Sequence, residues 1–356
     1  MILKTLHSYK CFFLFIVLFP LFYIFLSTSY VYSKNLEIRN IEIIKKFDNN
    51  FEKNQVINKG FDLAFKELIF KLVQSDDQRN VINVPLEIIN TFIENFSIKE
   101  EKFINNKYFV SLDVSFNKQK IFNFLEKKNV FPSLPKKKKI MFIPIMINED
   151  KSEIILFSEN DLYINWISKN DKKDLLEYIV PNEDLDDIIL IKKRLGNLEN
   201  YNFEEIINKY SLNDYIISLF YFNDEKIRVL SKINLNDNLI LDNQEYPIYD
   251  SLDDLYVIIK ELKIKFNDLW KRENLINTSI KLPLIISIDL KDNKKIKDFE
   301  NLIENMDLVS SYFVSSLDNK KIYYTLIYNG TPKSFIKNIE ENGNKIDFKK
   351  KIWNLE

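Results

Sequence analysis

The sequence predicts an α/β (α+β) multidomain protein, built from several small mixed sheets with packed helices. The chain has 356 residues, and one hydrophobic core stops growing at roughly 250–300 residues, so more than one folding unit is expected. Segments that alternate between polar and apolar residues are interspersed with segments of helical spacing, as strands and helices require. Apolar residues make up 46% of the chain, which is enough to fill several small cores.

The first 33 residues predict an export signal. Residues 1–10 carry lysines and no acid, residues 11–26 are an unbroken apolar run, and Val31 and Ser33 stand at the −3 and −1 positions for cleavage after Ser33. The alternative is a retained N-terminal membrane anchor, because an apolar run extended to about 20 residues can cross a bilayer. Either way, we expect a protein in the periplasm, or membrane-anchored and facing it, with membrane contact only through this segment.

Residues 34–130 predict an N-terminal α/β domain. Apolar residues recur at helical spacing over 57–72, and residues 108–116 alternate strictly between apolar and polar side chains. The alternating segment is expected to be a half-buried strand that pairs with residues 96–104 through a tight turn. Asn117 is expected to cap the helix that follows.

Residues 131–139 predict a linker, because they hold two prolines and a run of lysines. Residues 140–274 predict a middle α/β domain. Pro144 interrupts its first strand, which indicates a position near a sheet edge or a strand end. Residues 215–222 are apolar on both faces and therefore predict a central strand.

Residues 275–356 predict a C-terminal ferredoxin-like domain. The order of its expected elements is β-α-β-β-α-β, which is the split motif of that fold. Thr331 is expected to cap the second helix, with Pro332 at its first position and Gly343 just past its end. Residues 345–353 are expected to form one last strand. Many functions use this fold, so it does not select one.

The composition limits the chemistry that the protein can perform. His7 and Cys11 are the only histidine and cysteine, and both lie in the export segment. Cleavage would therefore exclude a Ser-His-Asp triad, a cysteine nucleophile, a zinc site of the usual ligands and any disulfide. The few glycines lack the spacing of nucleotide-binding loops. A near-balanced charge of 51 basic and 52 acidic residues argues against nucleic acid. We expect no cofactor, no nucleic-acid partner and no enzymatic activity.

One candidate site is an acidic cluster that follows Pro181. It consists of Glu183, Asp184, Asp186 and Asp187. Paired carboxylates of this kind can bind a divalent metal or perform acid–base chemistry. The alternative is the acidic first turn of a helix, where negative charge meets the exposed amides.

A second candidate is the pair Asn165 and Trp166, which could line a binding groove with Tyr163 nearby, and Asp184 and Asp187 are further candidate binding residues. The alternative for Trp166 is that it covers a hydrophobic core, as large aromatic side chains near loops usually do.

The chain resembles a family of exported proteobacterial proteins known as domain of unknown function 2066. The resemblance rests on the export segment and on KYFVSLDVSF, KKIMFIPIMI followed by LYINW, IVPNEDLDDI, and VSSYFVSSLDNKKIYYTLIYNG. The proline that the family usually has beside the Asn-Trp pair is absent here. The resemblance implies a location in the cell envelope and supplies no established activity.

These observations lead to one main hypothesis and two alternatives. The protein is expected to be a non-enzymatic binding or assembly factor of the envelope, with an envelope protein or a ligand of unknown identity as its partner. The first alternative is a metal-dependent hydrolase that uses the acidic cluster at residues 183–187. The second is a periplasmic module that binds a small ligand on the C-terminal sheet.

Overall fold

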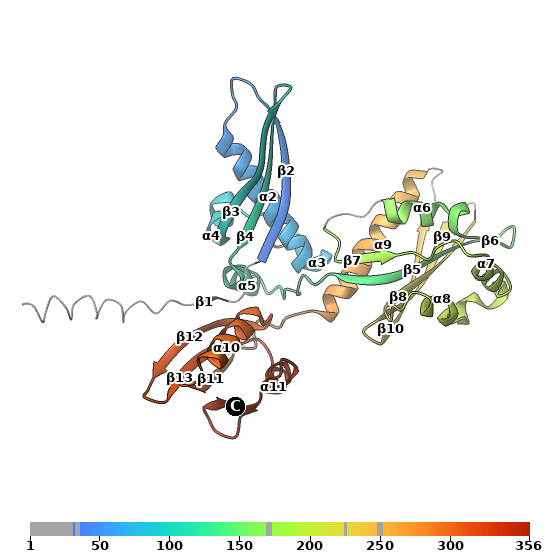
Figure 1. Cartoon of the computed structure of the whole chain (residues 1–356). Helices are drawn as coiled ribbons and strands as arrows, with labels where there is room; N and C mark the ends of the chain where they lie inside the picture. Colours follow the sequence, from blue (N-terminus) through green and yellow to red (C-terminus); the bar gives the residue numbers. More distant parts are fainter. Residues whose placement is uncertain (1–30, 33–35, 169–172, 224–225, 248–251) are drawn as a thin grey trace, which may run out of the picture. The chain divides into compact units, whose positions relative to one another are not determined.

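The computed structural model describes residues 31–32, 36–168, 173–223, 226–247 and 252–356 (Figure 1). The predicted cleavage site after Ser33 lies outside these residues. No helix in the described ranges is long and apolar enough to cross a membrane. Sheets and helices are mixed throughout, so the predicted α/β class is confirmed.

The chain divides into two compact units. Unit 1 consists of Met1–Phe51, Asn90–Asn129 and Ile276–Glu356, and unit 2 consists of Glu52–Ile89 and Val130–Leu275. The predicted boundaries near residues 130 and 275 coincide with points of this division. The structure differs from the prediction in that 52–89, expected in the N-terminal domain, belongs to unit 2.

Unit 1 contains a three-stranded antiparallel sheet in the order β2-β4-β3. Its strands are β2 (Leu36–Lys46), β3 (Ile93–Ile104) and β4 (Lys107–Phe116). The alternate apolar residues of the central β4 are fully buried, as its strict alternation predicted. Asn105 and Asn106 form the turn between β3 and β4, both with positive φ, which asparagine tolerates in tight hairpins. The predicted hairpin is therefore confirmed.

The helix α5 (Lys118–Lys127) follows this sheet. Its predicted cap is confirmed, because the Asn117 side chain accepts a hydrogen bond of 3.0 Å from the Lys120 amide. Lys118, at the start of the helix, donates to the main-chain carbonyl of Asp307. The two parts of unit 1 thus meet at this helix.

The C-terminal part of unit 1 has the predicted order of elements. They are β11 (Leu282–Asp289), α10 (Asn293–Asn305), β12 (Val309–Leu317), β13 (Lys321–Tyr328) and α11 (Pro332–Glu341). The strands run in the order β1-β12-β13-β11-β15-β14, where β1 is Val31–Tyr32. Thr331 caps α11 by accepting from the Ser334 amide, and Gly343 has a φ of 78°, both as predicted.

The prediction of a single last strand over residues 345–353 is wrong. Two short strands are present instead, β14 (Ile346–Asp347) and β15 (Trp353–Leu355), and β15 pairs in parallel with β11. The exposed lysines at 349–351 interrupt the apolar alternation. Charged side chains prefer solvent to a paired strand, and the chain turns there.

Unit 2 is a mixed sheet in the order β10-β9-β8-β5-β6, with β7 also paired to β5. Its strands are β5 (Lys138–Asn148), β6 (Glu153–Ile155), β7 (Leu176–Ile179), β8 (Tyr215–Phe222), β9 (Lys226–Leu235) and β10 (Asn238–Pro247). β8 is central, as predicted. β7 and β6 pair with opposite ends of β5, and Pro144 lies between those two paired stretches. The local edge that its proline predicted is therefore present.

Helices lie on both faces of this sheet. They are α6 (Asp161–Ser168) and α9 (Leu252–Glu273), which contribute to one core, and α7 (Leu185–Lys192) and α8 (Glu204–Asn208), which contribute to the other. Unit 2 also contains α2 (Lys53–Leu72) and α3 (Ser75–Gln78), while α4 (Leu86–Phe92) spans the boundary between the two units in the sequence. Successive residues of β5 point to opposite faces, so Phe142 belongs to one core and Met141 to the other.

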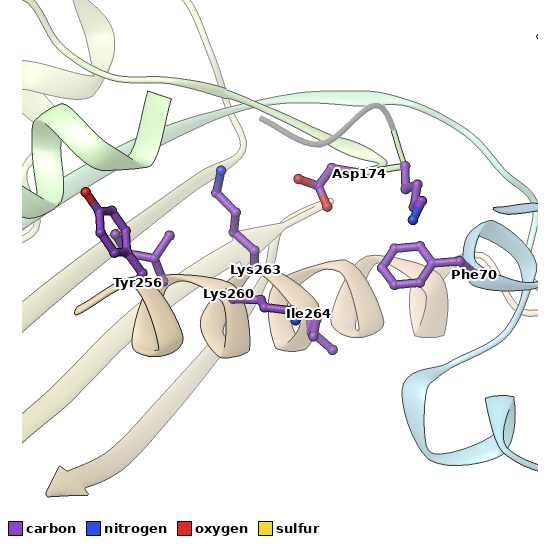
Figure 2. Close-up of a pocket in the computed structure, with 8 residues that line it drawn as sticks. Phe70, Asp174, Tyr256, Lys260, Lys263 and Ile264 are labelled. Atoms are coloured by element: carbon purple, nitrogen blue, oxygen red, sulfur yellow. The ribbon is translucent and has the colours of Figure 1, made fainter. Parts of the chain in front are cut away.

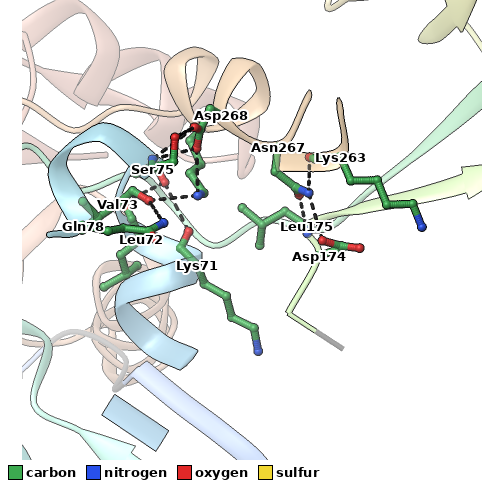
Figure 3. A network of polar contacts seen from close by, with 12 residues as sticks. Lys71, Leu72, Val73, Ser75, Gln78, Asp174, Leu175, Lys263, Asn267 and Asp268 are labelled. Atoms are coloured by element: carbon green, nitrogen blue, oxygen red, sulfur yellow. Dashed lines mark hydrogen bonds and ion pairs between the residues drawn. The ribbon is translucent and has the colours of Figure 1, made fainter. Parts of the chain in front are cut away.

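Polar contacts explain why 52–89 belongs to unit 2 (Figure 3). The amide and hydroxyl of Ser75 both donate to the carboxylate of Asp268 in α9. Ser133 is fully buried, and its amide donates to the Leu72 carbonyl at 2.7 Å. The predicted linker at 131–139 is thus hydrogen-bonded to the end of α2 at Ser133. Buried main-chain groups that find such partners hold a segment firmly.

Candidate functional site

A pocket of about 530 Å³ opens in unit 2 (Figure 2). Its lining residues come from α2, from the segment before β7 and from one face of α9. They are Phe70, Lys173, Asp174, Tyr256, Ile259, Lys260, Lys263 and Ile264. Pockets that hold small molecules range from about 300 to 1,000 Å³ and combine apolar walls with a few polar groups. This pocket has both properties.

The helix α9 places its five lining residues on one face. These residues recur every three to four positions, which is the spacing of neighbours on one face of a helix. They are Tyr256, Ile259, Lys260, Lys263 and Ile264. The lining contains three lysines and one aspartate. The charge of the pocket is therefore positive.

Lys263 is the buried cation of the site. Only 5% of the residue is exposed, and its Nζ donates a hydrogen bond of 2.8 Å to the main-chain carbonyl of Trp166. The same Nζ lies 5.5 Å from the ring centre of Trp166 and 5.4 Å from that of Tyr178. Aromatic faces attract cations, and this attraction grows where water is excluded. The aromatic walls therefore stabilise the buried charge.

Asn267 fixes the segment before β7 against α9 (Figure 3). Its Oδ1 accepts from the Leu175 amide at 2.8 Å, and its Nδ2 donates to Asp174 Oδ1 at 3.0 Å and to the Lys263 carbonyl at 2.8 Å. One buried amide thus positions both an acidic and a basic residue of the lining. Fully satisfied buried amides of this kind give a site a defined geometry.

Lys173 and Lys260 are exposed at the pocket. The ring of Phe70 lies 6.0 Å from Lys173 Nζ and 5.1 Å from Lys271 Nζ. An apolar wall thus carries cations at its edge. Such an arrangement suits a ligand with an apolar body and a negative charge.

The two aromatic rings near Lys263 each carry a buried polar atom. Trp166 Nε1 and the Tyr178 hydroxyl have no hydrogen-bond partner within the described part of the chain. Burial, followed by the charge of Asp174, raises the pKa of Tyr178 well above its usual value. The phenol therefore stays protonated and can donate a hydrogen bond.

The structure places the predicted residues Asn165 and Trp166 in the helix α6. Trp166 is fully buried and stacks on Phe142, with ring centres 3.8 Å apart. Asn165 donates a hydrogen bond of 2.8 Å to the Asp161 carbonyl within the same helix. Trp166 therefore covers the core, which was the alternative interpretation, and it meets the site through its carbonyl and ring.

The predicted acidic cluster forms the start of α7. Asp184 caps the helix by accepting from the amides of Asp186 and Asp187 at 2.8 and 3.4 Å. The Asp186 amide, then Lys209, lowers the pKa of Asp184. Lys209 Nζ lies 3.2 Å from Asp184 and 2.6 Å from Asp187, whose side chain is only 3% exposed.

The four carboxylates do not come together as a metal site. Glu183 accepts a hydrogen bond from the Ser158 hydroxyl at 2.8 Å, whereas Asp184 and Asp187 share Lys209. Across the described residues, no three His, Cys, Asp or Glu side chains converge to hold a metal ion. The geometry instead agrees with the acidic first turn of a helix, the alternative raised for this segment.

Comparison with known proteins adds no function. No protein-family model and no curated protein matches the chain. Among solved structures, an uncharacterized protein is similar at 11% identity and a TM-score of 0.19, over 40% of this chain and 95% of the other. The resemblance to the family of unknown function stays a prediction.

Proposed function

We propose that this protein is a non-enzymatic binding protein whose unit 2 takes up a small amphipathic anion. The pocket of about 530 Å³ with apolar walls and three lysines carries the proposal. Its volume fits a small organic molecule, and its charge favours a carboxylate, sulfonate or phosphate on that molecule.

Different lining residues would contact the apolar body and the charged group of such a ligand. Phe70, Ile259 and Ile264 offer an apolar surface to its body. The exposed Lys173 and Lys260 attract its charge. Lys263 adds a fixed positive charge from within, because its position is set by the Trp166 carbonyl.

We also propose that the protein works in the cell envelope, since its N-terminal segment has the pattern of an export signal or anchor. The metal-dependent hydrolase is less well supported, because Asp184 and Asp187 are engaged by Lys209. A role in assembling another envelope component is compatible with a ligand pocket.

Calorimetry with three naphthalene derivatives tests the binding proposal. The probes are naphthalene-2-sulfonate, naphthalene-2-methanol and 2-naphthylmethylammonium, which share a ring and differ in charge. The protein is used with the N-terminus that it carries in cells, whether or not the first 33 residues are cleaved. We expect the sulfonate to bind most tightly. The Lys260→Glu variant should weaken its binding about tenfold, since it turns an attraction at the pocket into a repulsion.

Lys59→Glu is the matched control, because Lys59 is an exposed lysine of α2 outside the lining. It makes the same change in net charge. Equal weakening by both variants, or tighter binding of the ammonium probe than of the sulfonate, would overturn the proposal.

A further inference from the structure

One end of the three-stranded sheet of unit 1 exposes large apolar side chains. We call this end the hairpin tip and define it as residues 43–47 of β2 and its continuation, with 102–108 around the β3–β4 turn (Figure 1). Ile44, Phe103 and Ile104 are 63%, 58% and 57% exposed, and Phe47 is 47% exposed. Exposed apolar groups gathered at one place usually mark an interaction surface.

Aromatic packing holds the hairpin tip in a fixed shape. Phe47 lies 4.9 Å from Phe51 and 5.2 Å from Phe103, measured between ring centres. The buried Tyr108 lies 4.9 Å from both Phe51 and Phe103. These contacts leave the outer edges of Phe47 and Phe103 in solvent while their positions are set.

Four lysines lie in the hairpin tip, namely Lys45, Lys46, Lys102 and Lys107. Acidic residues flank the tip on both sides, and Lys102 forms an ion pair with one of them, Glu100. Lys46 and Lys107 stand directly opposite each other in the register of β2 and β4, and both are exposed. Like charges directly opposite in a sheet repel each other, so a negatively charged surface at this place would stabilise the pair.

We propose that the hairpin tip inserts into the surface of an anionic lipid bilayer. Its apolar side chains lie on both faces of the strands and at the turn, so they form a projecting end rather than a groove. On β4, Tyr108 and Lys107 point to opposite faces, and their partners on β3 are Phe103 and Ile104. A fluid bilayer can receive such an end from all sides, whereas a protein partner needs a larger matching surface.

The mixture of residues fits the boundary between headgroups and acyl chains. Phenylalanine and isoleucine gain by entering the apolar layer, and lysines beside them extend their charge to the headgroups. Each lysine near an anionic membrane strengthens binding about fivefold. This contact would add to the one expected from the N-terminal segment, and it is independent of the pocket in unit 2.

An environment-sensitive fluorophore at the tip tests the proposal in the full chain. Cys11 is the only cysteine, so a Cys11→Ser background with Ile104→Cys carries one nitrobenzoxadiazole label. The protein is mixed with phosphatidylcholine vesicles with and without phosphatidylglycerol. We expect a blue shift of the label, and quenching by brominated lipids, in the anionic vesicles. These signals report the tip itself, whatever the N-terminal segment does.

Two controls make the result specific. A label at Leu239→Cys, an exposed position of β10 in unit 2, should keep its water-like emission. Replacing both facing lysines, by Lys46→Gln with Lys107→Gln, should weaken the insertion of the Ile104 label about 25-fold. Water-like emission from Ile104→Cys in all vesicles would overturn the proposal. So would equal insertion into neutral vesicles, or a blue shift without vesicles, which would indicate self-association.

Discussion

The Nζ of Lys271 donates a hydrogen bond of 2.9 Å to the main-chain carbonyl of Val73, which lies 198 residues earlier in the chain. Lys271 is almost fully buried, and its second partner is the carboxylate of Asp268 at 3.1 Å. Burial lowers the pKa of Lys271, and Asp268 opposes that effect. One lysine of α9 therefore holds the residue that ends α2.

We expect Lys271→Met to lower the free energy of unfolding of unit 2 by about 2–3 kcal/mol, because a buried carbonyl and a carboxylate each lose one of their donors and the carboxylate loses its cation. Chemical denaturation followed by the fluorescence of Trp166 and Trp270, both in unit 2, measures the change. Arg272→Met replaces the exposed neighbour in the same helix turn and should have little effect. Equal losses in the two variants would contradict this role.

Lys118 should make the stability of unit 1 depend on pH. Burial lowers its pKa to about 8, below its usual value in the unfolded chain. The unfolded state then binds the proton more tightly, so the charged lysine costs stability below pH 8. The free energy of unfolding rises as pH increases above that value, by up to about 3 kcal/mol in total.

Denaturation from about pH 7 to about pH 9.5 captures about 2 kcal/mol of this rise, and tryptophan fluorescence, to which Trp353 of unit 1 contributes, follows it. The upper limit avoids the buried tyrosines, such as Tyr312, whose burial raises the pKa and makes stability fall above pH 10. Lys118→Met should flatten the profile. Lys127→Met, an exposed lysine of the same helix, should leave it unchanged, and a flat profile in the parent chain would refute the prediction.

Lys209 should stabilise unit 2, because its charge neutralises the buried carboxylate of Asp187. Lys209→Met leaves a carboxylate that is only 3% exposed without its cation. We expect a loss of about 1–3 kcal/mol, at the low end of buried pairs because Lys209 itself is partly exposed. Adding Asp187→Asn should restore part of the loss, since the buried charge is then gone. Thermal or chemical unfolding of both variants measures these changes. A double variant that is less stable than Lys209→Met would contradict the prediction.

Trp166 should matter for stability rather than for direct ligand contact. Trp166→Ala removes a fully buried ring that stacks on Phe142, and we expect a cost of about 3–5 kcal/mol. Trp166→Phe keeps an aromatic face near Lys263 and should bind naphthalene-2-sulfonate within about threefold of the parent chain. A large loss of affinity in a well-folded Trp166→Phe protein would instead support the original prediction of a binding residue.

Much of the secondary structure was predictable, because its signals are local. The caps Asn117 and Thr331 act on amides three residues away, and the alternation of β4 lies within ten residues. Strand β10 was missed, since its exposed face mixes Leu239 and Leu241 with polar residues, and its inward Ile240 and Tyr246 are only partly buried. No buried apolar pattern marks such an edge strand.

The pocket was not predictable from local patterns. It joins Phe70, Lys173 and the α9 face around Lys260, which are far apart in the sequence. The burial of Lys263 could not be predicted from its helix, because a lysine is normally expected on the exposed face. Only the structure shows its partner, the Trp166 carbonyl. The acidic cluster misled in the opposite way. Its carboxylates are close in sequence, yet Lys209 and helix amides engage them.

The division of the chain also sets the order in which the two units can be completed during synthesis. Unit 2 ends at Leu275, whereas unit 1 still needs Ile276–Glu356. The segments of unit 1 that emerge first must therefore wait for the last part of the chain, while unit 2 can already be whole. A premature stop near residue 275 would keep every residue that lines the pocket and leave unit 1 without its second sheet.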